Sequence, residues 1–230
     1  MPTGGPANNA DLPSDPPGQP DEPRVSRASV GRFSLYLRRL QQLDSADAHT
    51  VSSSQLGEAL GITDAQVRKD LACLGNLGHP GVGYPTRELI AALRRRLGID
   101  RSWSVVVMGV GNLARALLRY RGFQQQGFRI VALFDADPEK VGQEVDGLRV
   151  FAPERMAEVI AATGAQLGIL TVPSEVAQKV ADALVAAGIV GVLNFAPTVL
   201  RLPGHVSLVA VDLAVQLEQL AFLVQTSTSP

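Results

Sequence analysis

The sequence is poor in cysteine, histidine and aromatic residues, and these shortages exclude several classes of protein. Cys73 is the one cysteine, so the chain cannot form an intramolecular disulfide, and nothing indicates an oxidising compartment. The three histidines, His49, His79 and His205, are too scattered to form a cluster of metal ligands. We therefore expect neither a disulfide scaffold nor a metal centre.

The chain also lacks an excess of charge and an export signal. Its formal net charge of −1 excludes a strongly basic nucleic-acid coat and an acidic tail. No basic region followed by an apolar stretch opens the chain, so we expect no signal peptide. The longest uncharged run, Ala183–Leu200, reaches membrane-spanning length, but two glycines, an asparagine and a proline interrupt it. With 46% hydrophobic residues, the chain is expected to be a cytoplasmic protein with a sizeable core and no membrane span.

Composition varies along the chain and suggests where it divides. Residues 1–31 hold seven of the 15 prolines and few large apolar groups, which predicts a disordered leader. Residues 32–96 carry nine Lys/Arg against six Asp/Glu, a net charge of +3, whereas residues 97–230 carry 10 against 12. The basic excess therefore lies in one small domain, where a nucleic-acid partner should be sought.

That small domain has the lengths of a helix-turn-helix. Ser53–Leu60 and Thr63–Leu74 are predicted helices separated by Gly61, and each has a hydroxyl residue followed three residues later by glutamine, the capping-box pattern. An amphipathic helix, Arg32–Leu43, precedes them. In the second short helix the apolar residues face the core, which leaves Gln66, Arg68, Lys69 and Cys73 outside. Such a helix suits a DNA major groove, although a solvated helix face has the same pattern.

The glycine-rich stretch Gly75–Tyr84 predicts a tight hairpin, the wing of a winged helix. A helix over Thr86–Leu97, capped by Thr86 and ended by Gly98, closes the domain. Its three C-terminal arginines are explained by the helix dipole and carry no separate functional weight. Cys73 is a weak candidate for a thiol sensor, because it has no resolving partner.

The second half opens with a dinucleotide-binding pattern. The apolar strand Ser104–Met108 enters the loop Gly109-Val110-Gly111-Asn112-Leu113-Ala114, which begins a helix. Gly109 permits the tight turn, and Gly111 lets the backbone approach a pyrophosphate. A second strand, Phe128–Phe134, ends at Asp135, placed to accept from ribose hydroxyls and to disfavour a 2′-phosphate. The pattern predicts an NAD(H) site.

Strands and helices continue to alternate, with strands at Gln166–Val172, Val190–Phe195 and Val206–Val211 and a helix at Ser174–Ala187. This alternation predicts an α/β chain with a Rossmann-type, doubly wound parallel sheet over residues 99–211. Thr171, Pro173 and Asn194 follow strand ends, where such sheets bind ligands. No acid/base pair accompanies them, so we expect no catalytic residues and a sensor of NADH and NAD+.

The C-terminal segment, residues 212–230, is predicted to form a helix over Asp212–Val224 that is apolar around much of its circumference. Either it packs on its own sheet or it mediates dimerisation.

These features together resemble the Rex family of redox-sensing transcriptional repressors, over residues 32 to about 224. The motifs that carry the resemblance, besides the Gly109–Ala114 loop, are Ala65–Leu71, Gly81–Tyr84, Phe134–Lys140, Leu170–Pro173, Leu193–Pro197 and Val211–Leu213. The resemblance implies a homodimer with exchanged C-terminal helices, a winged helix-turn-helix domain over residues 32–98, and release of an inverted-repeat operator in double-stranded DNA when NADH binds. It adds Ser53, Gly81 and Tyr84 to the DNA-binding residues.

The resemblance also implies a switch. Arg38 would pair with Asp212 of the partner subunit in the DNA-binding state. When NADH is bound, Asp212 would pair with Tyr120 instead of Arg38. Two departures from the family pattern bear on DNA binding and on the switch, respectively. Ala72–Leu77 and Gly78-His79-Pro80 replace the usual aromatic residues and basic wing, and Arg121 replaces a proline after Tyr120.

Three rival interpretations remain open. They are an NAD-dependent oxidoreductase with an accessory domain, a CoA-binding protein, and a helix-turn-helix protein whose nucleotide domain only dimerises.

Overall fold

The structure is a computed structural model that describes residues 26–79 and 81–227. Most of the expected leader, and Pro80 of the expected wing, therefore lie outside the described residues. The last residues assigned to the leader are helical, because α1 (Arg27–Ser45) begins five residues before the expected Arg32. The Ser26 hydroxyl accepts from the backbone N–H of Ser29 and starts the helix at this earlier point. The chain divides into two compact units between Leu97 and Gly98, within one residue of the expected boundary.

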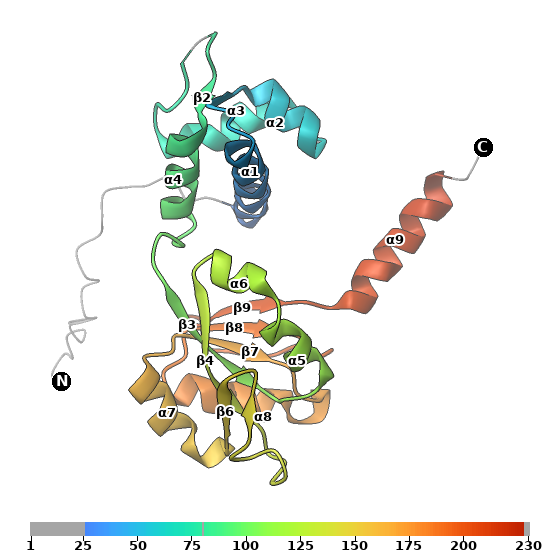
Figure 1. Cartoon of the computed structure of the whole chain (residues 1–230). Coiled ribbons are helices and arrows are strands. Elements are labelled where there is room, and N and C mark those ends of the chain that lie inside the picture. Colours follow the sequence, from blue (N-terminus) through green and yellow to red (C-terminus); the bar gives the residue numbers. More distant parts are fainter. Residues whose placement is uncertain (1–25, 80, 228–230) are drawn as a thin grey trace, which may run out of the picture. The chain divides into compact units, whose positions relative to one another are not determined.

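The first unit is a small helical domain closed by a two-stranded sheet (Figure 1). Its elements after α1 are β1 (Thr50–Val51), α2 (Ser53–Leu60), α3 (Asp64–Leu71), the 3-10 turn η1 (Ala72–Leu74), β2 (Tyr84–Pro85) and α4 (Thr86–Arg96). Large apolar side chains from α1, α2, α3 and α4 fill one core, among them Phe33, Leu40, Leu56, Val67 and Leu89, each at most 1% exposed. The predicted helix-turn-helix is therefore present. Its second helix, α3, ends at Leu71 and not at the expected Leu74, because Ala72–Leu74 form a 3-10 turn.

The turn between α2 and α3 depends on two glycines. Gly61 caps α2 in the left-handed region, with φ +65°. Gly57 lies one turn earlier, where an added Cβ would come within 2.3 Å of the Ile62 carbonyl oxygen. The two helices approach this closely only because position 57 has no side chain.

The stretch expected to form a hairpin has little regular structure. A single antiparallel bridge joins His79 and Gly83, and β2 then pairs with β1. Thr86 does not cap α4 as expected, since Pro85 is the N-cap residue and makes no side-chain cap. Among the described residues, the buried Thr86 hydroxyl has no hydrogen-bond partner, while its backbone N–H donates to His49.

The second unit contains a seven-stranded sheet in the order β5-β6-β4-β3-β7-β8-β9. All neighbouring strands are parallel except the edge pair β5 and β6. The strands are β3 (Trp103–Met108), β4 (Phe128–Phe134), β5 (Glu144–Val145), β6 (Leu148–Phe151), β7 (Leu167–Leu170), β8 (Gly191–Asn194) and β9 (Ser207–Ala210). The order of the six parallel strands reverses between β3 and β7, as in a Rossmann fold, where a dinucleotide binds at that crevice.

Helices cover the two faces of this sheet (Figure 1). On one face α7 (Met156–Thr163) and α8 (Ser174–Ala186) pack against Val106, Met108 and Phe134. On the other, α5 (Asn112–Leu118) and α6 (Arg121–Gln125) pack against Val105, Val107 and Leu133. Successive residues of β3 face opposite cores, as strand geometry requires. The β5–β6 hairpin, α6, α7 and the 3-10 turn η2 (Pro153–Arg155) are not among the predicted elements.

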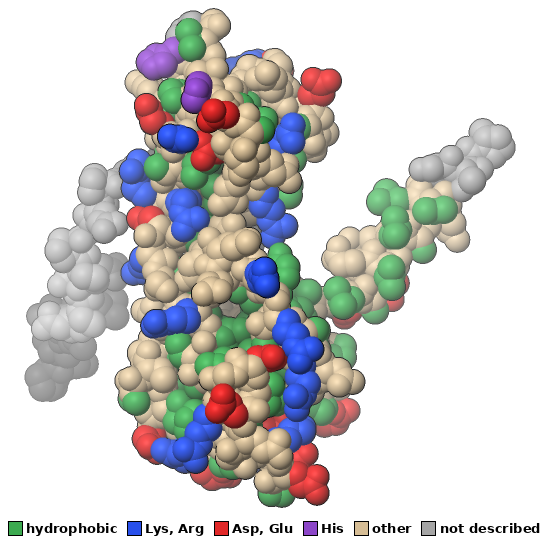
Figure 2. All heavy atoms as spheres, viewed as in Figure 1, with side chains coloured by type: hydrophobic (Ala, Val, Ile, Leu, Met, Phe, Trp, Pro, Cys, Tyr) green, Lys and Arg blue, Asp and Glu red, His purple; other side chains and the backbone are tan. Residues whose placement is uncertain are grey.

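The chain ends in α9 (Leu213–Ser227), which the Asp212 carboxylate caps by accepting from the backbone N–H groups of Ala214 and Val215. Its apolar side chains are not covered by the chain's own sheet, since Leu213, Leu217 and Phe222 are each more than 60% exposed. Figure 2 shows hydrophobic side chains along its visible surface. Of the two alternatives for this helix, packing on its own sheet is therefore wrong. Within the described ranges, no helix has the length and apolarity needed to cross a membrane.

Candidate functional site

The glycine-rich loop lies between β3 and α5 and has the geometry of a dinucleotide loop. Gly109 has φ +88°, and an added Cβ would lie 2.8 Å from the Thr171 carbonyl oxygen. Gly111 is the N-cap residue of α5, and an added Cβ there would meet nothing within 4 Å. The first glycine therefore sets the turn, and the second leaves the backbone open to a ligand.

Buried loop residues and hydrogen bonds from Thr171 hold the loop in this conformation. Val110 and Ala114 are buried against the sheet, whereas Asn112 and Leu113 are exposed at the start of α5. The Thr171 hydroxyl donates to the carbonyl oxygens of Met108 and Gly109, at 3.0 and 2.8 Å. In the structure Thr171 thus fixes the loop from the neighbouring strand end.

Asp135 follows β4 and is bonded to the same loop. Its Oδ2 accepts from the backbone N–H of Val110 at 2.7 Å and from Lys140 Nζ at 3.1 Å, and its Oδ1 accepts from the backbone N–H of Asp137 at 2.9 Å. Burial by itself raises the pKa of Asp135, but the donors from Asp137, Val110 and Lys140 outweigh burial, so the pKa lies below its usual range. A carboxylate offers about four acceptor sites, so Asp135 retains about one for a ribose hydroxyl.

A cavity of about 490 Å³ opens beside this carboxylate. It is lined mainly by apolar side chains from β3, β4, η2, α7 and α8, including Met108, Met156 and Val176, and also by Pro173 and Asp135. Its size, its apolar walls and the open glycine backbone fit the adenosine half of a dinucleotide. Asn194 does not line this cavity, because its buried amide bonds to the backbone of Ala196 and Thr198 and shapes the loop after β8.

The residues expected to bind DNA come together in the first unit. A groove of about 490 Å³ is lined by Ser53 of α2, Arg68 of α3, and Gly81 and Tyr84 of the glycine-rich stretch, together with Ser52 and residues 78, 79, 82 and 83. Arg68 donates to Asp64 at 2.6 Å and to Ser53 at 3.3 Å, so α2 and α3 share one basic surface. Lys69 is exposed next to it. Four of the six predicted residues thus meet at one groove.

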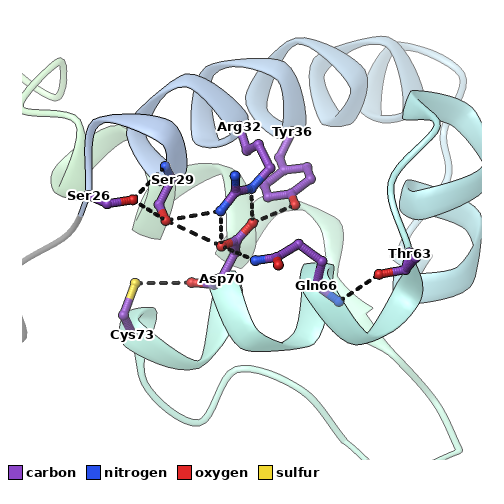
Figure 3. Close-up of polar contacts among 8 residues, drawn as sticks. All are labelled: Ser26, Ser29, Arg32, Tyr36, Thr63, Gln66, Asp70 and Cys73. Carbon is purple, nitrogen blue, oxygen red and sulfur yellow. Dashed lines mark hydrogen bonds and ion pairs between the residues drawn. The ribbon is translucent and has the colours of Figure 1, made fainter.

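Gln66 departs from the expectation. The Thr63 hydroxyl caps α3, but the Gln66 side chain does not reach back to complete a capping box, as the Ser52 and Gln55 pair does in α2. Instead, Gln66 Nε2 donates to Asp70 Oδ1 at 2.9 Å (Figure 3). Asp70 is a buried carboxylate that also bonds to Arg32 and Tyr36 of α1. Asp70 is not among the residues expected to have a role, although a charged residue among the core positions Val67, Leu71 and Leu74 of a helix was a usable signal.

The three residues of the expected switch lie apart in the chain. Arg38 is exposed on α1, and Asp212 caps α9. Tyr120 is 52% exposed, and its ring packs edge-on against Phe123 at 5.2 Å. Their pairing involves a second subunit, so it stays a prediction. No group of three or more potential metal ligands occurs in the part of the chain that the structure describes.

Comparison with known proteins matches both units. Residues 24–72 match the family described as "Putative DNA-binding protein N-terminus", and residues 100–198 match the "CoA binding domain" family. The redox-sensing transcriptional repressor Rex of Desulfitobacterium hafniense is 45% identical over 203 residues, covering 88% of this chain and 97% of the relative. The Rex protein of Streptomyces avermitilis is 43% identical, covering 86% of this chain and 79% of the relative.

Solved structures agree. The crystal structure of RSP in complex with NAD+ and operator DNA has a TM-score of 0.84 and 34% sequence identity, covering 89% of this chain and 94% of RSP. RSP in complex with NADH has a TM-score of 0.80 at 33% identity, covering 88% of this chain and 95% of RSP. These relatives are repressors, which confirms the expectation of a regulator and not an enzyme. The chain belongs to the Rex family of redox-sensing transcriptional repressors.

Proposed function

We propose that this chain represses transcription by binding an inverted-repeat operator in double-stranded DNA and that NADH releases it. The observation that carries this proposal is the likeness to Rex proteins across both units, one with a helix-turn-helix and one with a dinucleotide loop. A solved relative binds NAD+ together with operator DNA. We place the protein in the cytoplasm, where it has access to both the chromosome and the nucleotide pool.

In the first unit, the exposed cations Arg68 and Lys69 would meet DNA at the major groove, Arg68 at base edges and Lys69 at a phosphate that borders the groove. The Ser53 and Tyr84 side chains and the backbone at Gly81 would contact the phosphates that border it, since these residues line the same groove as Arg68. Phosphate contacts supply affinity, whereas the contacts of α3 with base edges supply sequence preference.

In the second unit, the backbone of the Gly109–Ala114 loop would receive the pyrophosphate of NADH, and Asp135 would accept from a ribose hydroxyl. Pro173 would form part of the wall of the site, and Thr171 would hold the glycine-rich loop through its bond to the Gly109 carbonyl oxygen. Asn194 would act indirectly, by shaping the loop after β8. NADH supplies the signal as a bound effector and is not consumed.

We also propose a homodimer in which α9 is exchanged between subunits. A cavity of about 320 Å³ with almost entirely apolar walls is lined by β3, β4, β7, β8 and β9 and by Phe123 of α6, with Ile169, Leu193 and Val209 among its lining residues. The exposed apolar side chains of α9 need such a surface, and a two-fold dimer presents two α3 helices to an inverted repeat.

The switch would act across that dimer. Asp212 of the partner subunit would pair with Arg38 when DNA is bound and with Tyr120 when NADH is bound. An aspartate that exchanges a cation for a phenol is a two-state element. Reversing its populations almost completely requires a ligand that prefers one state by about 5.5 kcal/mol.

The deciding experiment is fluorescence anisotropy of a labelled inverted-repeat duplex at fixed moderate salt, titrated with the full chain and then with NADH, NAD+ or CoA. We expect tight binding that NADH releases at lower concentration than NAD+ does, and no release by CoA. Release by CoA and not by NADH would favour the CoA-binding alternative. Turnover of NADH with a small hydroxy acid or keto acid would favour the oxidoreductase.

A glycine variant separates sensing from DNA binding. Gly109→Ala places a methyl group against Thr171 in a backbone conformation that disfavours side chains, so we expect it to bind the operator and ignore NADH. Gly204→Ala is the matched control, because its added Cβ meets nothing within 4 Å.

A further inference from the structure

We propose that Asp70 is a positioning residue for operator recognition, which holds the recognition helix α3 on α1 and directs Gln66 away from the bases. This inference rests on the proposed function, because it concerns how the DNA-binding surface of the first unit is oriented. It gives Gln66, which was expected to contact DNA, a place on the inner side of α3 instead.

Asp70 joins two helices that are far apart in the sequence (Figure 3). Arg32 Nε donates to Asp70 Oδ2 and Arg32 Nη2 donates to Oδ1 at 2.7 Å, which makes a two-pronged pair. Tyr36 lies one turn further along α1, and its hydroxyl donates to Oδ2 at 2.8 Å. Both donors come from α1 and the acceptor comes from α3, so the cluster fixes the angle and register between the two helices.

The carboxylate has no acceptor capacity left after these contacts. Its Oδ1 accepts from Arg32 and Gln66, its Oδ2 accepts from Arg32 and Tyr36, and the Ser29 hydroxyl approaches Oδ1 at 3.4 Å. Asp70 is 5% exposed and Tyr36 is fully buried. Burial by itself raises the pKa of Asp70, but the donors from Arg32, Tyr36 and Gln66 outweigh burial and lower the pKa below its usual range.

The two faces of α3 are therefore different in kind. Val67, Asp70 and Leu71 are buried on one face. Arg68 and Lys69 are exposed on the other, with the small exposed residues Ala65 and Ala72 at helical spacing on either side. Gln66 lies half-buried beside the inner face, and because a carboxylate only accepts, the amide nitrogen of Gln66 must face Asp70. One of the two amide protons of Gln66 is therefore committed to Asp70, and this bond turns the amide toward the inner face of α3, whereas bidentate pairing with adenine needs both the oxygen and the nitrogen of the amide to face the base.

A buried charge pair is a weak source of net stability, because desolvation of both groups offsets their attraction. Its geometry is restrictive, however, since a saturated carboxylate tolerates only the arrangement in which every donor reaches it. An apolar contact between α1 and α3 would allow small rotations of α3. The Asp70 cluster instead gives the outward face of α3 one orientation.

The test compares Asp70→Asn with Glu58→Gln in the full chain. Both variants remove one negative charge from the helix-turn-helix, and Glu58 is exposed on α2. The wild-type protein first selects an operator from a pool of randomised duplexes. Fluorescence anisotropy then measures the affinity of each variant for this operator and for a scrambled duplex, at a temperature below the melting transition of every variant. The measured quantity is the ratio of the two affinities, which a general gain of positive charge does not reduce.

We expect Asp70→Asn to lower this ratio roughly tenfold, the size of losing one good base contact, whereas Glu58→Gln leaves it unchanged. Equal ratios in the two variants would overturn the proposal. If Asp70→Asn does not fold, Tyr36→Phe is used in its place, because this variant removes one donor to Asp70 and keeps the aromatic ring. We then expect a smaller fall in the affinity ratio, and an unchanged ratio would overturn the proposal.

Two further measurements complete the test. Repeating the selection with Gln66→Ala should recover the wild-type base preferences at every position, whereas a lost preference at one position would assign Gln66 to a base and overturn the proposal. Backbone amide exchange in α3 without DNA should be faster in Asp70→Asn than in Glu58→Gln. If the wild-type protein selects no DNA, the proposed function fails. Separately, equal amide exchange rates in α3 of Asp70→Asn and Glu58→Gln would show that Asp70 does not hold the helix.

Discussion

Asp135→Asn is the variant that tests the dinucleotide site most directly. The substitution keeps the shape of the side chain and replaces one acceptor oxygen by an amide nitrogen. Asp135 now accepts from the backbone N–H groups of Val110 and Asp137 and from Lys140. An asparagine can satisfy donors on one oxygen only, so at least one backbone N–H loses its partner or faces another donor.

The size of the effect follows from the kind of bond that is lost. Hydrogen bonds to a charged group contribute about 1.5–3 kcal/mol each, so we expect Asp135→Asn to lower the free energy of unfolding of the second unit by about 2 kcal/mol. The affinity for NADH should fall as well, because the Val110 N–H belongs to the loop that would receive the pyrophosphate. We expect NADH binding to weaken by at least about tenfold, which corresponds to about 1.4 kcal/mol.

The assay has two arms. Urea unfolding followed by circular dichroism gives the free energy of unfolding, and the fluorescence of bound NADH gives the dissociation constant. Asp137→Asn is the matched control, because the Asp137 side chain is 40% exposed, pairs only distantly with Lys140 at 3.6 Å and accepts from the backbone N–H of Glu139. A dissociation constant for NADH in Asp135→Asn within twofold of the control would refute the argument that this carboxylate shapes the site.

The difference in unfolding free energy between wild type and Asp135→Asn should depend on pH, and the lowered pKa of Asp135 fixes the direction of that dependence. The pKa of Asp135 is lowered in the folded protein, so the unfolded chain binds this proton more readily than the folded chain does. The stabilisation is therefore complete above the unfolded pKa, near 3.9 for an aspartate, and is lost as the pH falls through the lower folded value. The difference in stability between wild type and Asp135→Asn should shrink below about pH 4 and stay constant from about pH 5 to 7.

Three other substitutions test separate parts of the structure. Lys69→Ala should weaken binding to operator and scrambled DNA alike and reduce the slope of log affinity against log salt by about 1, as expected for one lost phosphate contact; an unchanged slope in a salt titration would contradict that role. Gly57→Ala should destabilise the first unit by more than about 2 kcal/mol in urea unfolding, because its Cβ would lie 2.3 Å from the Ile62 carbonyl oxygen, whereas Gly31→Ala, with open space around it, should not. Asn194→Ala removes three buried hydrogen bonds to the loop after β8 and should cost about 2–3 kcal/mol, with a melting temperature close to wild type refuting the structural role.

The order of elements could be predicted because their signals are local. The strand Phe128–Phe134 has the predicted bounds, and α2 spans the predicted Ser53–Leu60, since a β-branched apolar run and a capping box act within one strand or one turn. The start of α1 was placed too late because its cap, Ser26, lies in a segment whose composition indicated disorder. The β5–β6 hairpin escaped prediction because Glu144–Phe151 has no strong periodicity of its own and is defined by the edge of the sheet. The helix α7 was missed although its buried residues Met156, Val159 and Ile160 have helical spacing.

At the candidate sites, too, local features could be predicted from the sequence and features that depend on distant residues could not. The backbone conformation at the first glycine of the loop could be predicted, since a positive φ or a close backbone approach leaves no alternative residue, as at Gly109. The hydrogen-bond partners of the polar side chains could not be predicted, because the sequence does not show which donors and acceptors surround them. Asn194, Thr171 and Gln66 were expected to face ligands, and each bonds to its own chain.

These internal bonds determine what each polar residue retains for a ligand. Asn194 uses its amide oxygen once and its amide nitrogen twice. The hydroxyl proton of Thr171 points to backbone carbonyl oxygens, and one amide proton of Gln66 points to the Asp70 carboxylate. Asp135 keeps about one acceptor site, whereas Lys69 is exposed and the backbone at Gly111 is open. NADH should therefore be bound chiefly by backbone N–H groups whose positions the side chains maintain. Variants of those side chains should then alter the affinities for NADH and NAD+ together, while variants of Arg38, Tyr120 and Asp212 should alter the difference between them.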